Sequence, residues 1–172
     1  MEAEKVKALW NSITKSDASV HDILECLLPS LEAILKNARV KHAFGWLDTG
    51  GDRDRAHFIS CQTGGIQYVV VGLKDHREPD GTADISVQAA TWAEVAEVKQ
   101  TFALAENAAG SYRPIASLKS ASLHLRSGVE VPLMPSARQK GAGVRIADDG
   151  TWKDDLDPIR FVYAVLEMLG TR

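Results

Sequence analysis

Apolar residues recur at helical spacing in the first part of the chain. The first stripe consists of Val6, Leu9, Trp10 and Ile13. This i, i+3, i+4, i+7 order predicts a helix with one apolar face. Ser19-x-x-Asp22 then resembles a capping box and precedes a broader apolar pattern over residues 23–35. The two patterns predict a helical N-terminal part over residues 1–38.

From residue 40 the apolar period changes to two, which is typical of strands. The segments with this pattern are 43–47, 57–61, 65–74, 83–89, 123–126, 129–133, 144–146 and 151–152. The run 65–74 is the most continuously apolar, and we interpret it as the central strand, buried on both faces. Segments 43–47 and 57–61 predict a hairpin, as do 123–126 and 129–133. Pro132 lacks an amide donor, so the second hairpin is predicted to end in an edge strand.

Two further helices are predicted. Thr91-x-x-Glu94 has the form of a capping box, and apolar residues at helical spacing follow it, so residues 92–108 are expected to form a middle helix. Asp157-Pro158 predicts the start of a C-terminal helix. The expected fold is an α+β domain over residues 1–172, in which residues 40–172 hold a mostly antiparallel mixed sheet. The two N-terminal helices, the middle helix and the C-terminal helix pack on that sheet.

Composition adds the class of protein. Apolar residues make up 45% and charged residues 25%, with a formal net charge of −3, which is the usage of a soluble globular chain without a general attraction for nucleic acid or acidic membrane. Cys26 and Cys61 are the only cysteines and lack metal-ligand spacing. Because no run approaches the roughly 20 apolar residues of a membrane helix, we expect a cytoplasmic protein without a membrane partner.

One motif suggests catalysis. Pro79-Asp80, or Asp84, followed by Glu97-Val98-Lys99 resembles the Pro-Asp…(Asp/Glu)-x-Lys signature of the restriction-endonuclease-like nucleases. The resemblance implies that the carboxylates hold Mg²⁺ while Lys99 orients the nucleophile or neutralises the oxyanion. Residues two apart share a face on a strand but point roughly 200° apart on a helix. The conformation of residues 94–101 therefore decides between a nuclease site and a solvated helix face.

Histidines and acids gather around the first predicted strands. They are His42, Asp48, Asp52, Asp54, His57, Asp75 and His76. Adjacent strands could bring several of them together as metal ligands. The segment 50–55 also alternates in charge, which is typical of a self-neutralising exposed hairpin tip. We therefore assign no metal site and no cofactor here.

The segment 111–145 is the clearest charge asymmetry in the chain. Its candidate binding residues are Arg113, Lys119, His124, Arg126, Arg138, Lys140 and Arg145, with Glu130 as the only acid. His124 and Arg126 alternate with leucines and are expected to face solvent. This pattern predicts a patch for phosphates or an acidic partner, or else an edge strand that charge protects from pairing.

These observations favour a non-enzymatic accessory or regulatory module that binds a partner protein, with the basic hairpin as a candidate contact for nucleic acid. The alternative is a magnesium-dependent nuclease using Asp80 or Asp84 with Glu97 and Lys99. Magnesium is the expected cofactor only in that alternative. The sequence does not identify the partner.

Overall fold

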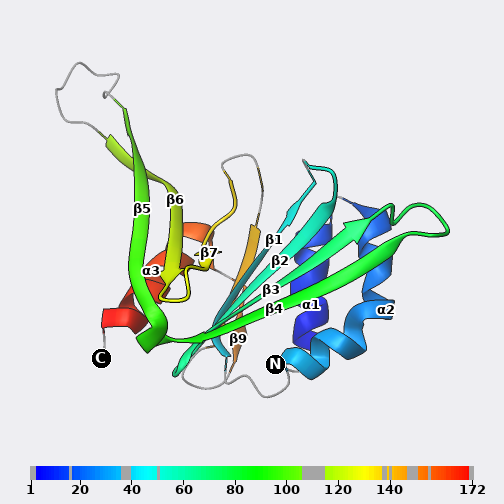
Figure 1. Ribbon diagram of the computed structural model, residues 1–172, viewed down its shortest axis with the longest axis horizontal. Helices are drawn as coiled ribbons and strands as arrows, with labels where there is room; N and C mark the ends of the chain where they lie inside the picture. Colours follow the sequence, from blue (N-terminus) through cyan, green and yellow to red (C-terminus); the bar gives the residue numbers. More distant parts are fainter. Residues whose placement is uncertain are drawn as a thin grey trace.

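The computed structural model describes residues 3–15, 17–35, 40–49, 51–105, 115–136, 139, 141–146, 151–154 and 156–170. Figure 1 shows the order of the elements along the chain. The helices are α1 (Ala3–Thr14), α2 (Ala18–Leu35), the short 3₁₀ helix η1 (Trp92–Glu94) and α3 (Pro158–Gly170). The strands are β1 (Val40–Asp48), β2 (Asp54–Gln62), β3 (Gly65–Lys74), β4 (Thr82–Thr91), β5 (Val95–Ala105), β6 (Ile115–Leu125), β7 (Glu130–Pro132), β8 (Gly141–Ile146) and β9 (Trp152–Lys153).

Within the described ranges the strands form two sheets. Sheet A has six strands in the order β4-β3-β2-β1-β8-β9, and sheet B has three in the order β5-β6-β7. Every strand pair among these residues is antiparallel. The α+β class is confirmed, whereas the single mixed sheet is wrong. Sheet B rises from one end of sheet A, and α1 and α2 lie together on one face of sheet A (Figure 1).

The first core lies between sheet A and the two N-terminal helices. The predicted α1 stripe is correct, since all four of its residues are buried. It packs on every second residue of β3, namely Val69, Val71 and Leu73, because successive strand residues point to opposite faces. Each buried side chain of this size contributes about 1.5–3 kcal/mol. Apolar burial therefore holds the helix layer on the sheet.

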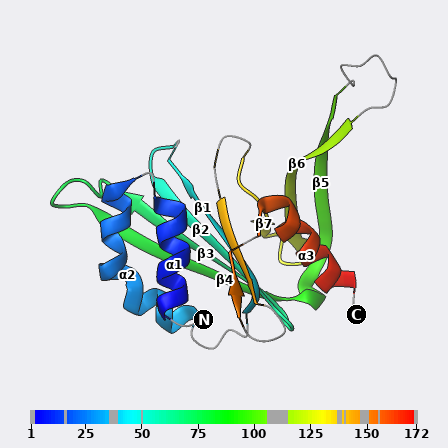
Figure 2. The ribbon, with the colours of Figure 1, turned by 180° about the vertical axis from the view of Figure 1, so that it is seen from behind.

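The second core fills the corner between the other face of sheet A, sheet B and α3. Figure 2 shows α3 lying across sheet B in this corner. The Phe44 and Phe161 rings stack with centroids 5.3 Å apart, and Leu123 of β6 belongs to the same buried cluster. The predicted start of α3 is confirmed, because Oδ1 of Asp157 accepts a hydrogen bond from the amide of Arg160 at 2.9 Å.

The middle helix predicted over residues 92–108 is wrong for residues 95–105, and residues 106–108 lie outside the described ranges. Thr91 and Glu94 do interact as the motif suggests, since the Thr91 amide and hydroxyl donate to Oε2 of Glu94 at 2.6 and 2.9 Å. The helix they start ends after Trp92–Glu94, and Val95–Ala105 forms β5, paired with β6. Local capping starts one turn, but the ladder to a distant strand determines the rest.

Two smaller expectations also change. The N-cap of α2 is Asp17, not Ser19, because Oδ1 of Asp17 accepts from the amides of Ser19 and Val20 at 3.1 and 3.3 Å. The strand Gly65–Lys74 has the predicted bounds, but it lies second from the edge of sheet A, next to β4. The hairpins β1–β2 and β6–β7 are confirmed, with β7 at the edge of sheet B.

Candidate functional site

The structure does not bring the nuclease-like residues together. Glu97 and Lys99 share one face of β5, as a strand requires, opposite His124 and Ser122. Asp84 lies near the start of β4, opposite Gly72, with an ion pair of 3.2 Å to Arg53. The side chains of Glu97, Lys99, Asp84 and Arg53 are exposed. The side chain of Asp80, in the turn before β4, is also exposed, whereas those of His124 and Ser122 are not.

The separation follows from strand geometry. Asp84 is seven residues from Thr91 along β4, and at about 3.3 Å per residue this is about 23 Å. The chain then turns through η1 and β5 leads away from sheet A (Figure 1). Two carboxylates that bind one Mg²⁺ must both lie within about 2–3 Å of it. Asp84 and Glu97 therefore do not share a magnesium site.

The histidines and acids of the first strands are divided between separate places. His42 pairs with Cys61 at one end of β2, and Asp54 lies seven residues away at the other end, about 23 Å along the strand. His57 lies between them, opposite Trp46. Among the residues that the structure describes, no group of three or more His, Cys, Asp or Glu side chains is arranged to hold a metal ion.

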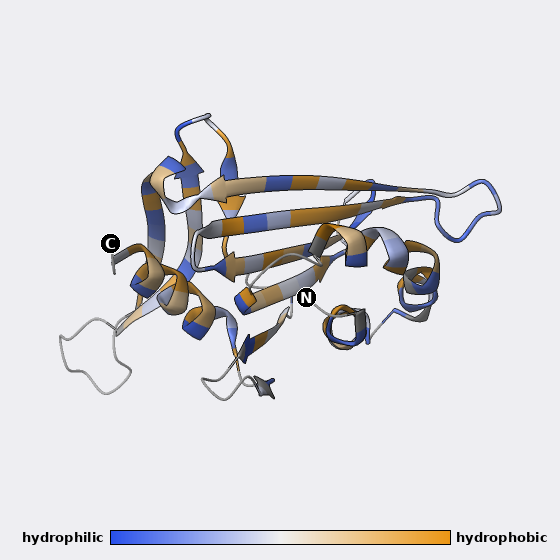
Figure 3. Ribbon diagram, turned by 90° about the horizontal axis from the view of Figure 1, so that it is seen from below, coloured by the Kyte–Doolittle hydropathy of each residue, from blue (hydrophilic) through white to orange (hydrophobic). Residues whose placement is uncertain are grey.

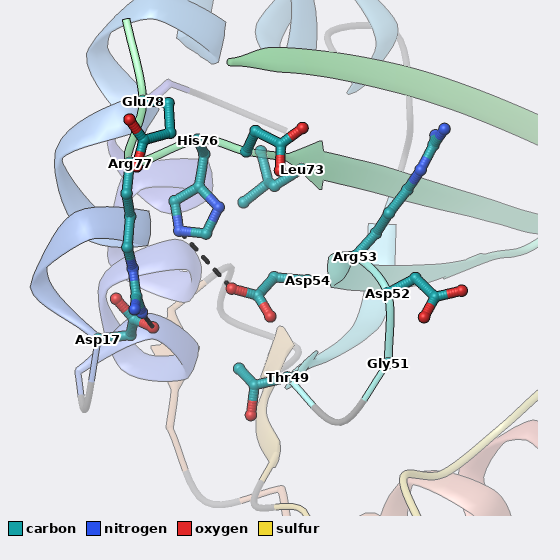
Figure 4. Close-up of a pocket in the computed structure, with 11 residues that line it drawn as sticks. Asp17, Thr49, Gly51, Asp52, Arg53, Asp54, Leu73, His76, Arg77 and Glu78 are labelled. Atoms are coloured by element: carbon teal, nitrogen blue, oxygen red, sulfur yellow. Dashed lines mark hydrogen bonds and ion pairs between the residues drawn. The ribbon is translucent and has the colours of Figure 1, made fainter. Parts of the chain in front are cut away.

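The acids and the histidine near the Asp54 end of β2 line a polar pocket of about 390 Å³. Figure 4 shows His76 and Asp54 pointing toward one another in the pocket, with Asp17 beside them. The pocket joins the start of α2, the β1–β2 loop and the turn after β3. Asp17 is held by Arg77 at 3.2 Å and by the Ser19 hydroxyl at 2.6 Å. Hydrogen bonding to Ser19 lowers the pKa of Asp17, so its carboxylate is ionised near neutral pH.

Serine, histidine and aspartate meet in this pocket without forming a nucleophilic relay. Nε2 of His76 lies 3.1 Å from the Ser19 hydroxyl and 3.6 Å from Oδ2 of Asp54. In a catalytic triad the serine and the acid contact different ring nitrogens. The Ser19 hydroxyl also donates to Asp17. These contacts tie the turn after β3 to the start of α2 and are structural.

Among the histidines that the structure describes, His57 has the most strongly shifted pKa. Its ring stacks on Trp46 with centroids 4.8 Å apart, and its Nδ1 lies 2.8 Å from the Tyr68 hydroxyl. Burial lowers the pKa of His57 to about 4 and raises the pKa of Tyr68 to about 12. Both side chains are therefore neutral at pH 7, and the imidazole acts as part of an aromatic stack.

This shift makes the fold sensitive to acid. An unfolded histidine titrates near 6.5, so the stabilisation by neutral His57 is complete above that pH and is lost as the pH falls toward 4. Between pH 7 and pH 5 we expect the wild type to lose on the order of 1–2 kcal/mol more than His57→Phe, which keeps a ring beside Trp46. Urea unfolding at both pH values measures this difference. Equal pH dependence of the two proteins would contradict it.

The predicted basic residues have mixed surroundings. Arg126 lies at the β6–β7 turn, where its Nε donates to the carbonyl of Ala93 at 3.2 Å. Nε2 of His124 lies 3.7 Å from Oε1 of Glu130 and 3.2 Å from the Ser122 hydroxyl. Lys119 is exposed on β6. Arg145 lies on β8, directly opposite His42 of β1 in the sheet. Arg113, Arg138 and Lys140 lie outside the described residues.

Sequence reasoning missed an apolar strip on the β5–β6 hairpin. Phe102 pairs with Leu118 and Leu104 with Ala116, so these four side chains lie on one face. Phe102 is 44% exposed and Leu104 is 72% exposed. Assigning this segment to a helix concealed the strip, since only a strand places Phe102 and Leu104 on the same side.

No protein-family model, curated protein or solved structure matches this chain. In the part of the chain that the structure describes, none of the helices combines the length and the apolar character needed to cross a membrane.

Proposed function

We propose that this chain is a protein-binding module, accessory or regulatory in role, whose docking surface is the apolar strip formed by Phe102, Leu104, Ala116 and Leu118. The observation that carries the proposal is the exposure of two large apolar side chains side by side on a projecting hairpin. Isolated exposed apolar residues are common on proteins, whereas a contiguous exposed apolar patch is typical of an interaction site, and the adjacent pair supports such a site here.

The architecture of sheet B supports the same conclusion. β7 pairs only with Ser122, Leu123 and His124, so within the described residues the outer part of the hairpin has two strands. Figure 1 shows β5 and β6 extending well beyond β7 and away from sheet A. A two-stranded ribbon is only marginally stable in water, and a third strand or a helix on its apolar face stabilises it. A partner protein bound there would supply this cover.

The opposite face of the hairpin has a different character. Glu97, Lys99 and Thr101 occupy odd-numbered positions of β5, opposite in phase to Phe102 and Leu104, and are exposed. The strip therefore has a polar reverse side, and one face is suited to a partner while the other is suited to water.

The proposal predicts a loss of binding when the strip is made polar. The double variant Phe102→Ser, Leu104→Ser should weaken partner binding by at least about 30-fold, since central apolar contacts typically contribute 2 kcal/mol or more. Glu97→Ser with Lys99→Ser, on the reverse face, is the matched control and should bind as the wild type does.

A photo-crosslinking amino acid identifies the partner. Placed at position 104, it should yield one principal adduct in a lysate of the source organism, and at position 99 it should not. Adducts of equal yield at both positions would refute the proposed surface. Magnesium-dependent DNA cleavage that Glu97→Ala with Lys99→Ala abolishes would favour the nuclease alternative instead. Salt-sensitive nucleic-acid binding that falls with Lys119→Gln would indicate the basic hairpin as the functional surface.

A further inference from the structure

The free edge of sheet A is β4, and its chemistry is unusual for an exposed edge. β4 lies at the end of the strand order, so one side of its backbone has no strand partner among the described residues. Exposed edge strands can pair with another chain, and proteins usually prevent this with lysine, proline, bulges or short strands. The other edge of sheet A is β9, with only two residues.

β4 has none of those protective features. It is ten residues long with the sequence TADISVQAAT, and it contains neither lysine nor proline. Its register with β3 runs without a bulge from Gly65↔Thr91 to Lys74↔Thr82. Its one charged side chain, Asp84, is ion-paired to Arg53 of the β1–β2 loop. The edge is therefore long, regular and nearly neutral.

One face of this edge is also apolar. Ile85 packs partly against the first core, so it lies on the side of sheet A that α1 and α2 cover. Val87, two residues on, lies on the same side and is 42% exposed. Figure 3 shows the strands of sheet A from the side of these helices, with apolar and polar positions alternating along them. The exposed part of the Val87 side chain is therefore free to contact a further apolar side chain.

We propose that β4 pairs with β4 of a second copy of this chain, giving a two-fold symmetric dimer with one continuous antiparallel sheet. Antiparallel pairing about a two-fold axis perpendicular to the sheet keeps the helix-covered faces on the same side. With the axis at Ser86, Ile85 lies opposite Val87 of the second copy on the apolar side. Asp84 lies opposite Gln88, whose amide can donate to the carboxylate.

The residues of β4 favour a second copy of this chain as the partner that binds this edge. This register opposes apolar with apolar side chains and a carboxylate with an amide. It places no two like charges opposite one another, which would destabilise the pair. The dimer is independent of the apolar strip on the β5–β6 hairpin, since that strip lies on sheet B.

Cysteine cross-linking tests the register. The background is Cys26→Ser, since Cys26 is exposed while Cys61 is buried. Directly opposed residues in an antiparallel pair have Cα atoms about 4.5–5.5 Å apart, within disulfide range. Ser86→Cys should therefore give a disulfide-linked dimer under mild oxidation, whereas Asp52→Cys, exposed in the β1–β2 loop, should not. Linkage through Val87→Cys instead would contradict this register, because an axis at residue 87 places Ile85 opposite Ala89 and Asp84 opposite Ala90.

Sedimentation over a wide concentration range supplies the second measurement. The wild type should be a dimer and Ser86→Lys a folded monomer, because the variant places two lysines opposite one another. Phe102→Ser with Leu104→Ser should remain a dimer, which separates this interface from the proposed docking strip. A wild-type monomer at every concentration overturns the proposal. So does a dimer that survives Ser86→Lys and does not cross-link at position 86.

Discussion

Replacing Trp10 with alanine is expected to lower the free energy of unfolding by about 3–5 kcal/mol, a large part of the roughly 5–15 kcal/mol typical of a domain. Trp10 is fully buried between α1 and sheet A, and its ring stacks on Phe58 with centroids 5.6 Å apart. Alanine removes this contact and leaves a cavity in the first core. The midpoint of urea unfolding, followed by circular dichroism, measures the loss.

Two controls in the same helix separate the effect of the cavity from other effects. Trp10→Phe keeps an aromatic ring against Phe58 and should cost clearly less than alanine. Ser12→Ala alters an exposed residue on the same helix and should change stability by no more than about 0.5 kcal/mol. If Trp10→Ala were as stable as Ser12→Ala, α1 would not be packed on sheet A as described.

Gly65→Ala is expected to destabilise the fold by about 3 kcal/mol, at the upper end for inserting one methyl group into a packed site. A Cβ at position 65 would lie 2.9 Å from Cα of Thr91 and closer still to the carbonyl oxygen of Ala90. Both are backbone atoms of β4, so neither can rotate away. The strands β3 and β4 would have to separate where the chain turns toward sheet B.

The adjacent glycine provides the matched control. A Cβ at Gly64 would meet no atom within 4 Å, so Gly64→Ala should change the free energy of unfolding by no more than about 0.5 kcal/mol. Thermal unfolding of both variants measures the contrast. Similar losses at positions 64 and 65 would show that the cost comes from the turn and not from contact with β4.

The structure divides the expected site residues among several surfaces. Asp84, Glu97 and Lys99 each lie on a strand, but on two different sheets. Spacing along the chain identifies residue types suited to nuclease chemistry, but it does not show where a sheet ends and another begins. The exposure of the apolar strip likewise could not be predicted from the sequence, because it depends on the position at which β7 stops pairing with β6.

Elements with a strong local pattern were predictable from the sequence. The α1 stripe, the hairpin β1–β2, the bounds of β3 and the Asp157 cap of α3 follow from apolar period, turn residues and capping chemistry. Each depends on neighbours close in the chain. For this reason the sequence by itself determined the α+β class and most element positions.

Only the tertiary structure decided the conformation of residues 95–105, the division into two sheets and the edge position of β4. Thr91 and Glu94 favour a helix locally. Residues 95–105 nevertheless form a strand, because β5 pairs with β6, and over residues 95–100 the paired residues are more than twenty positions apart in the sequence. Strand pairing satisfies backbone groups across the whole segment, whereas a cap satisfies only one turn. Which strand is left at an edge likewise depends on all the other pairings, and that edge is where we expect the second copy to bind.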